Sequence, residues 1–339
     1  MDVEAAREAP DHAAYRPLLA GADVGPGPRG VVMRPLGLVG EGGWSPRRAL
    51  TVCMLFAAAV AAILSACQRE ERYEGQPLEF WVAALRNADP RVREQAVEVV
   101  ARAAPRSPRT VDMLLDVLEA ESDTNLYVVI AETLGELGPV AEPAVQRLAQ
   151  LLTDDHREVR EAAATALGMI GPPAAPAAPV LAAALRDCCH DVRAAAAEAL
   201  GRIGPGAISA GPSLIECQGD GISWVRLKCV ESLVAIGAKS PEAVGAFTRA
   251  LDDPREAVRA TAASGLARAG PGASTSVAAL ARRLGSDPYP GVRLAAAKAL
   301  AAIGPAARGA LPELERAQSD SNFSVRAAVR DAMIRIGGA

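Results

Sequence analysis

A position that is arginine in seven of eight cases recurs along this chain at intervals of 33 or 34 residues. Such a row of guanidinium groups could bind an anionic ligand. Alternatively, each arginine could pair with the acidic residue that usually lies six positions before it, in its own or a neighbouring repeat. We favour a repeated ion pair that fixes the stacking of the repeats. These ladder positions are Arg93, Tyr127, Arg160, Arg193, Arg226, Arg259, Arg293 and Arg326.

A second regular series lies five residues after each ladder position and is mostly acidic. Its glutamates are Glu98, Glu132, Glu198 and Glu231. Glu98 and Glu198 have arginines four residues on, Arg102 and Arg202, which would neutralise them along the same helix. Glu132 and Glu231 lack such a partner. The series is therefore either a solvated helix face or a groove for a basic or polar peptide, with Glu132 and Glu231 its least compensated members.

Cysteines offer two further candidates. Cys188, Cys189 and His190 form the most metal-like cluster, but three adjacent residues cannot easily point at one ion, so we predict no metal site. Cys217 and Cys229 fall on the expected buried faces of two helices in one repeat. They could form a disulfide in an oxidising compartment, or remain buried thiols that act as small core residues.

Composition and motifs argue against catalysis and against nucleic acid. The sequence contains no P-loop, H-E-x-x-H or G-x-S-x-G motif and only three histidines. Its formal net charge is -4 and only 3% of its residues are aromatic, whereas a nucleic-acid interface needs a basic surplus on one face. We therefore predict no enzyme activity, no cofactor and no nucleic-acid partner.

The elements that position these residues follow from the repeat itself. In each repeat, an Asp lies between two segments whose apolar residues recur with helical spacing, and it is expected to cap the second helix. A Gly eleven residues after the ladder position, usually followed by Pro, is expected to end that helix. In the third repeat, the apolar residues of the second helix fall on one face. They are Val159, Ala162, Ala163, Ala166, Leu167 and Ile170. Eight such pairs of antiparallel helices predict an all-α solenoid.

The D-x(5)-R spacing and second helices such as "VREAAATALGMIG" resemble HEAT repeats of the short phycobilisome-lyase type over residues 76–339. The resemblance implies a right-handed α-solenoid whose second helices line a concave face that binds a protein or peptide partner. The repeat subtype also implies an alternative, a bilin lyase or isomerase subunit. A signal peptide would argue against that alternative, because attachment of bilins to phycobiliproteins is intracellular.

A different signal precedes the repeats. Arg47 and Arg48 lead into an apolar run, and residues 64–67 resemble a bacterial lipobox whose Cys67 would be acylated and become the mature N-terminus. The alternative is an uncleaved signal anchor, because residues 49–67 carry no charge and could just span a bilayer. Gln68, rather than Asp, after the cysteine favours the outer membrane, facing the periplasm.

These features predict four segments. Residues 1–46 form a disordered extension or an over-extended start, 47–67 the lipoprotein signal, 68–75 a polar tether and 76–339 the repeat array. We therefore expect a non-enzymatic interaction scaffold, lipid-anchored at the bacterial envelope, that binds a protein partner on the concave face of the solenoid.

Overall fold

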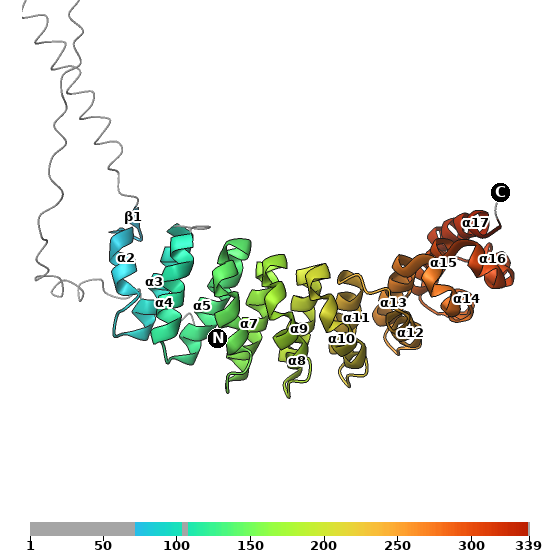
Figure 1. Ribbon diagram of the computed structural model, residues 1–339. Helices are drawn as coiled ribbons and strands as arrows, with labels where there is room; N and C mark the ends of the chain where they lie inside the picture. Colours follow the sequence, from blue (N-terminus) through green and yellow to red (C-terminus); the bar gives the residue numbers. More distant parts are fainter. Residues whose placement is uncertain (1–71, 104–107, 338–339) are drawn as a thin grey trace, which may run out of the picture. The chain divides into compact units, whose positions relative to one another are not determined.

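A computed structural model describes residues 72–103 and 108–337 (Figure 1). The predicted extension at 1–46 and the signal segment at 47–67, including Cys67, lie outside these described residues. The described part begins with an antiparallel pair of two-residue strands, β1 (Arg72–Tyr73) and β2 (Gln76–Pro77). The indole N–H of Trp81 donates to the Tyr73 carbonyl at 2.9 Å. The last residues of the predicted tether therefore contact the first repeat.

Eight helical hairpins follow, and they stack in chain order (Figure 1). The first helices of the hairpins are α2 (Leu78–Ala84), α4 (Pro108–Ala120), α6 (Val145–Leu151), α8 (Ala178–Ala184), α10 (Gly211–Cys217), α12 (Pro241–Ala250), α14 (Val277–Ser286) and α16 (Leu311–Ala317). The second helices are α3 (Pro90–Ala103), α5 (Thr124–Glu136), α7 (Arg157–Ile170), α9 (His190–Ile203), α11 (Ser223–Ala235), α13 (Glu256–Ala269), α15 (Pro290–Ile303) and α17 (Phe323–Gly337). The predicted all-α solenoid of eight two-helix repeats is confirmed.

A glycine with positive φ follows six of the eight second helices, as predicted, whereas Gly337 lies inside α17. Gly171 follows α7 with φ 77° and Gly204 follows α9 with φ 74°, conformations that a residue with a Cβ adopts only under strain. A short 3-10 helix then leads into the next first helix in most repeats. These connecting helices are η2 (Gly138–Ala144), η3 (Pro172–Ala177), η4 (Gly204–Ala210), η5 (Gly270–Ser276) and η6 (Gly304–Ala310).

The role predicted for the aspartates as helix caps was wrong. Asp187 precedes the N-cap residue of α9, Cys189, by two positions and accepts the backbone N–H of Cys189 at 2.8 Å. The Cys189 side chain makes no capping hydrogen bond. Asp187 therefore orders the turn before the helix and leaves its second carboxylate oxygen free for another donor.

The core consists mainly of aliphatic side chains and alanine, with Phe247 as its one fully buried aromatic residue in the described chain. All six residues predicted to share one face of α7 are at most 5% exposed. Successive second helices pack closely because the position eight residues after the ladder position is glycine in the second, third and fourth repeats. A Cβ added to Gly168 of α7 would lie only 2.9 Å from the Cα of Ala199 in α9. The small residues thus set the separation of neighbouring repeats.

Candidate interaction surface

The ladder arginines connect each repeat to the next. Arg160 donates through Nε to Asp187 of the following repeat at 2.7 Å and through Nη2 to the other carboxylate oxygen at 3.0 Å. Its Nη1 donates to the Asp154 carbonyl of its own repeat at 2.8 Å. The sequence left open whether the acidic partner belongs to the same or a neighbouring repeat. The carboxylate comes from the neighbour, and the repeat's own Asp contributes its backbone carbonyl.

The same two-sided arrangement recurs at five other junctions in the described residues. The remaining pairs are Arg93–Glu121, Arg193–Asp220, Arg226–Asp253, Arg259–Asp287 and Arg293–Asp320. The Arg259 and Asp287 side chains are the most buried, at 7% and 0% exposure. Burial opposes ionisation of Asp287, but hydrogen bonds from Arg259 and from the Tyr289 backbone N–H outweigh it and hold the pKa of Asp287 below its ordinary value.

Two ladder positions differ from the others. The Tyr127 hydroxyl donates to the Glu121 carbonyl at 2.7 Å, which replaces the backbone contact of an arginine but supplies no cation for Asp154. Asp154 accepts the His156 backbone N–H at 2.8 Å, as Asp187 accepts that of Cys189, and its Oδ1 also lies 3.0 Å from the His156 ring Nδ1. At the other exception, Arg326 donates through Nη1 to the Asp320 carbonyl, and no carboxylate in residues 72–103 or 108–337 accepts from its Nε or Nη2. The ladder is therefore interrupted at one junction and open at Arg326.

The glutamate series is neutralised differently from the prediction. The expected pair of Glu98 with Arg102 does not form, because Arg102 pairs with Glu74 at 2.8 Å. Glu231 was predicted to lack a partner, but the Lys228 ammonium lies 3.5 Å from it. The predicted Glu198–Arg202 pair is present at 2.7 Å.

Lys228 also lies 3.0 Å from Glu198, so one lysine serves two glutamates. Glu132 on α5 is exposed, and none of its neighbours in the described ranges forms an ion pair with it. Within the series, the glutamates without an ion pair in the described residues are therefore Glu98 and Glu132, of the first and second repeats.

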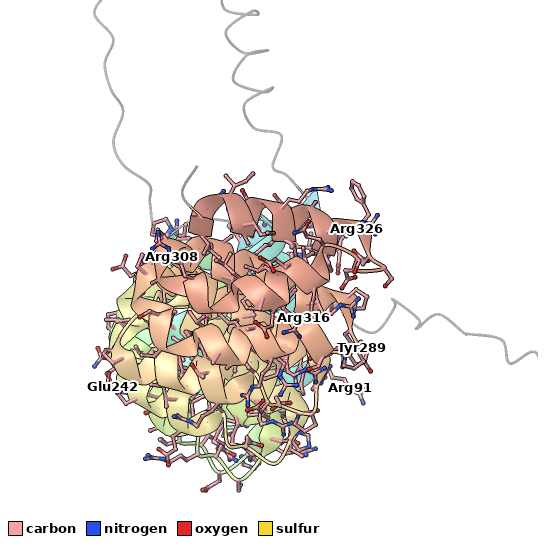
Figure 2. All side chains as sticks on the ribbon, turned by 90° about the vertical axis from the view of Figure 1, so that its right-hand side faces the viewer. Arg91, Glu242, Tyr289, Arg308, Arg316 and Arg326 are labelled. Carbon is pink, nitrogen blue, oxygen red and sulfur yellow. A yellow bond between two sulfur atoms is a disulfide. The ribbon has the colours of Figure 1, made fainter. Side chains whose placement is uncertain are left out.

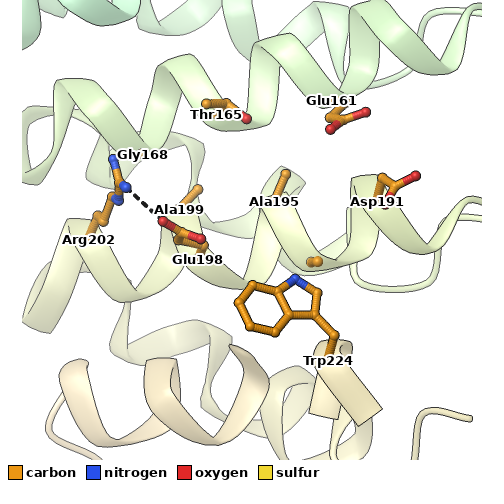
Figure 3. Close-up of a pocket in the computed structure, with 10 residues that line it drawn as sticks. Glu161, Thr165, Gly168, Asp191, Ala195, Glu198, Ala199, Arg202 and Trp224 are labelled. Atoms are coloured by element: carbon orange, nitrogen blue, oxygen red, sulfur yellow. Dashed lines mark hydrogen bonds and ion pairs between the residues drawn. The ribbon is translucent and has the colours of Figure 1, made fainter. Parts of the chain in front are cut away.

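A shallow cavity of about 210 Å³ lies between the second helices α7, α9 and α11. We call it the acidic groove and define it by Glu161, Asp191, Glu198, Arg202 and Trp224, with small residues between them (Figure 3). Figure 3 shows Glu161 on α7 across from Asp191 on α9, with the Trp224 ring below them. The groove thus combines carboxylates with an exposed aromatic side chain.

In the acidic groove, Glu198 is paired with Arg202 and Lys228 and Asp191 lies 2.9 Å from the His190 ring, so the uncompensated carboxylate is Glu161. Burial and then the negative charge of Asp191 raise the pKa of Glu161, with Arg157 opposing them and Glu132 adding to them. No ion pair of Glu161 occurs within the described chain. Trp224 is 47% exposed, and the Lys228 ammonium lies 4.6 Å from its ring centroid, so its indole already supports a cation.

Three members of the acidic groove, Glu161, Asp191 and Trp224, were absent from the sequence prediction. They lie one residue after or two residues before a ladder position, whereas the series examined in the sequence lies five residues after it. Positions three or four residues apart share a helix face. The same periodicity could therefore have identified them.

The four cysteines in the described residues divide into a disulfide-bonded pair and two free thiols. Cys217 of α10 and Cys229 of α11 form a disulfide with a Cα–Cα distance of 6.0 Å. Cys188 and Cys189 are free, and no group of three or more His, Cys, Asp or Glu side chains in the described ranges could hold a metal ion. No helix between residues 72 and 337, apart from the undescribed 104–107, is long and apolar enough to cross a membrane.

Stacked helical hairpins that share one continuous core define an α-solenoid. The chain belongs to the HEAT-repeat family, since the family model for HEAT repeats matches residues 78–156, 111–201, 177–267 and 245–334. A search of curated protein sequences finds no significant match.

Solved structures of similar fold include an engineered protein with 22% sequence identity and a TM-score of 0.58, in which the match covers 83% of this chain and 81% of that one. The E. coli protein YibA has 18% identity and a TM-score of 0.53, with 75% and 91% covered. The karyopherin Kap121p, bound to the extreme C-terminus of the protein phosphatase Cdc14p, has 15% identity and a TM-score of 0.52. That match covers 76% of this chain but only 33% of the karyopherin.

Proposed function

We propose that this protein is a non-enzymatic scaffold that an acylated Cys67 holds at the bacterial envelope, and that its second helices bind a basic segment of a protein partner. The observation that carries the partner chemistry is the acidic groove, where Glu161 and the adjoining Glu132 lack a paired cation beside the exposed Trp224. The anchor rests on the basic, apolar and lipobox-like segments that precede the array.

Charge and rigidity both support this partner class. A lysine or arginine side chain entering the acidic groove would reduce the repulsion between Glu161, Asp191 and Glu132. Its aliphatic stem would also pack against the exposed Trp224 ring, beside which Lys228 and Arg255 already lie. Because stacked repeats hold these side chains in place before binding, little ordering is required on association.

The fold similarity supports a protein ligand in general terms. Solved structures of Kap121p contain the C-terminus of Cdc14p, the SUMO protease Ulp1p or Nup53p. These complexes are examples of a helical array of similar fold that receives peptide or protein segments, and by analogy we assign a protein partner to this chain.

The test uses a fluorescein-labelled dodecapeptide of alternating lysine and serine as the probe. The double variant Glu132→Lys, Glu161→Lys should weaken probe binding by about tenfold or more at 0.15 M salt, because two charge-assisted contacts become repulsive. Fluorescence anisotropy measures the affinity, and thermal melting checks that the fold is retained.

The matched control places the same two charge changes on first helices and connecting segments. Glu119 of α4 and Glu142 of η2 are both exposed and lie outside the acidic groove. The variant Glu119→Lys, Glu142→Lys should reduce the affinity for the probe only slightly, because salt screens the long-range repulsion between the new charges and a probe bound in the groove. Equal losses in the two double variants would refute a specific role for the groove.

A further inference from the structure

The junction between α11 and α12, inside the array, is built differently from its neighbours. At the five junctions with a connecting 3-10 helix, the residue three positions after the positive-φ glycine is a fully buried alanine. These residues are Ala141, Ala174, Ala207, Ala273 and Ala307. After α11 the equivalent residue is Ser240, which is exposed and is the N-cap of α12. Because α12 begins four residues after Gly237, whereas α10 begins seven residues after Gly204, the chain enters the helix about one turn early and Ser240 does not take the place of the buried alanine.

A shallow cavity of about 600 Å³ lies at this junction. Its lining is mainly apolar and includes Ile208, Pro212, Ile215, Leu233 and Ala243. Ile208 is 53% exposed, although the same position in the other connecting helices is Glu142, Ala175, Ser274 or Arg308. Figure 2 shows Glu242, which also lines the cavity, on the same side of the array as Arg308 and opposite to Tyr289. The edge that carries the connecting helices thus exposes a large apolar side chain beside a cavity.

A second shallow cavity, of about 410 Å³, adjoins the first at Ile215, which lines both. Gln218 lines it too, and its amide Nε2 is buried without a hydrogen-bond partner in the described residues. Three carboxylates of this lining already have cations, in the pairs Glu216–Arg186, Asp252–Arg283 and Asp253–Arg226. Arg249 is exposed, and no carboxylate between residues 72 and 103 or 108 and 337 forms an ion pair with it. The second cavity therefore offers an amide donor and a cation to an acceptor.

We propose that the two adjoining cavities bind an extended segment of a partner protein, with an aliphatic side chain beside Ile208 and a carboxylate at Gln218 and Arg249. Charge complementarity favours the carboxylate, because Arg249 is the unpaired charge of the second cavity, while Lys239 and Glu242 offset each other at the first. An arginine and an amide donor can share the two oxygens of one carboxylate.

A protein segment fits this place better than a compact small molecule. At the other described junctions, a turn of chain with a buried alanine occupies the equivalent position. The six residues from Pro212 to Gln218 span about 9 Å along α10, a length that an extended chain covers in about three residues. The cavities share no lining residue with the acidic groove, so this inference does not depend on it.

The experiment uses the full 339-residue chain in detergent and the fluorescein-labelled peptide Glu-Ser-Ser-Leu-Ser-Ser-Glu. Its two carboxylates, three residues to either side of the leucine, allow binding in either chain direction. We expect Arg249→Gln to weaken binding about tenfold, because a charge-assisted contact is lost. Ile208→Ser should weaken it about fivefold, since an apolar contact is lost. Both side chains are exposed, so the fold should be retained in both variants.

Matched controls make the result specific. Arg308→Gln and Ile222→Ser remove an exposed arginine and an exposed isoleucine outside the two cavities and should leave binding unchanged. The peptide with glutamine in place of both glutamates should bind the unchanged protein as weakly as the original peptide binds Arg249→Gln. Undetectable binding to the unchanged protein, or equal affinities of the unchanged protein and the two cavity variants, would overturn the proposal. So would self-association, measured by sedimentation equilibrium, that Arg249→Gln abolishes, because the occupant would then be a second copy.

Discussion

Arg259→Ala should destabilise the array by about 3 kcal/mol, because it leaves the fully buried Asp287 carboxylate without its main partner. Two charge-assisted hydrogen bonds to the carboxylate and two to backbone carbonyls disappear together. Arg283 Nη1, at 3.8 Å from Asp287, is too distant to replace them with good geometry. Urea unfolding followed by circular dichroism measures the loss.

The chain supplies a matched control for this prediction. Arg326→Ala removes the same side chain and the same two backbone contacts, but no carboxylate in the described residues loses a partner. It should cost about 1 kcal/mol or less. Equal destabilisation by the two variants would mean that the backbone contacts alone carry the stabilising effect and that the ion pairs between repeats contribute little.

Gly168→Ala should destabilise the protein by about 1 to 2 kcal/mol, although alanine is the better helix former. The added methyl group would lie 2.9 Å from the Ala199 Cα and 3.2 Å from its Cβ, so α7 and α9 would have to move apart. That movement would also stretch the Arg160–Asp187 pair that joins the same two repeats. Thermal and urea unfolding should both register the change.

The same Gly→Ala change should have the opposite effect on stability at Gly245, inside α12. A Cβ there would meet only the end of the Arg249 side chain, at 3.7 Å. Without a clash, the lower backbone entropy of alanine in the unfolded chain should raise stability by about 0.5 to 1 kcal/mol. A stabilising effect at both glycines would contradict the claim that Gly168 sets the spacing of the repeats.

The fold could be predicted from the sequence because it depends on local signals repeated many times. The periodic arginine, the glycine after each second helix and the apolar face of α7 each specify structure within one repeat. For the ladder, the sequence predicted that arginine pairs with an acidic residue but not which repeat supplies that residue. An arginine lies six residues after one aspartate and 27 before the next, and only the stacking of the repeats decides which carboxylate it reaches.

The charge balance of the second helices was harder to predict, since it depends on contacts between distant residues. Arg102 pairs with Glu74, 28 residues earlier, rather than with Glu98. Lys228 reaches Glu198 of the preceding repeat as well as Glu231 of its own. Counting charges along one helix therefore wrongly predicted that Glu98 is paired and that Glu231 is not, while Glu132 has no ion pair in the described residues.

The proposed scaffold function depends on a lipid anchor at Cys67 that holds the repeat array at the bacterial envelope. The mass of the N-terminal peptide tests this anchor most directly. Protein purified from its native membrane should yield a peptide that begins at an acylated Cys67. That result would limit the partner to proteins outside the cytoplasm. An unmodified peptide that extends upstream through Arg47 would contradict the lipoprotein anchor and would return the signal anchor and the intracellular alternatives to consideration.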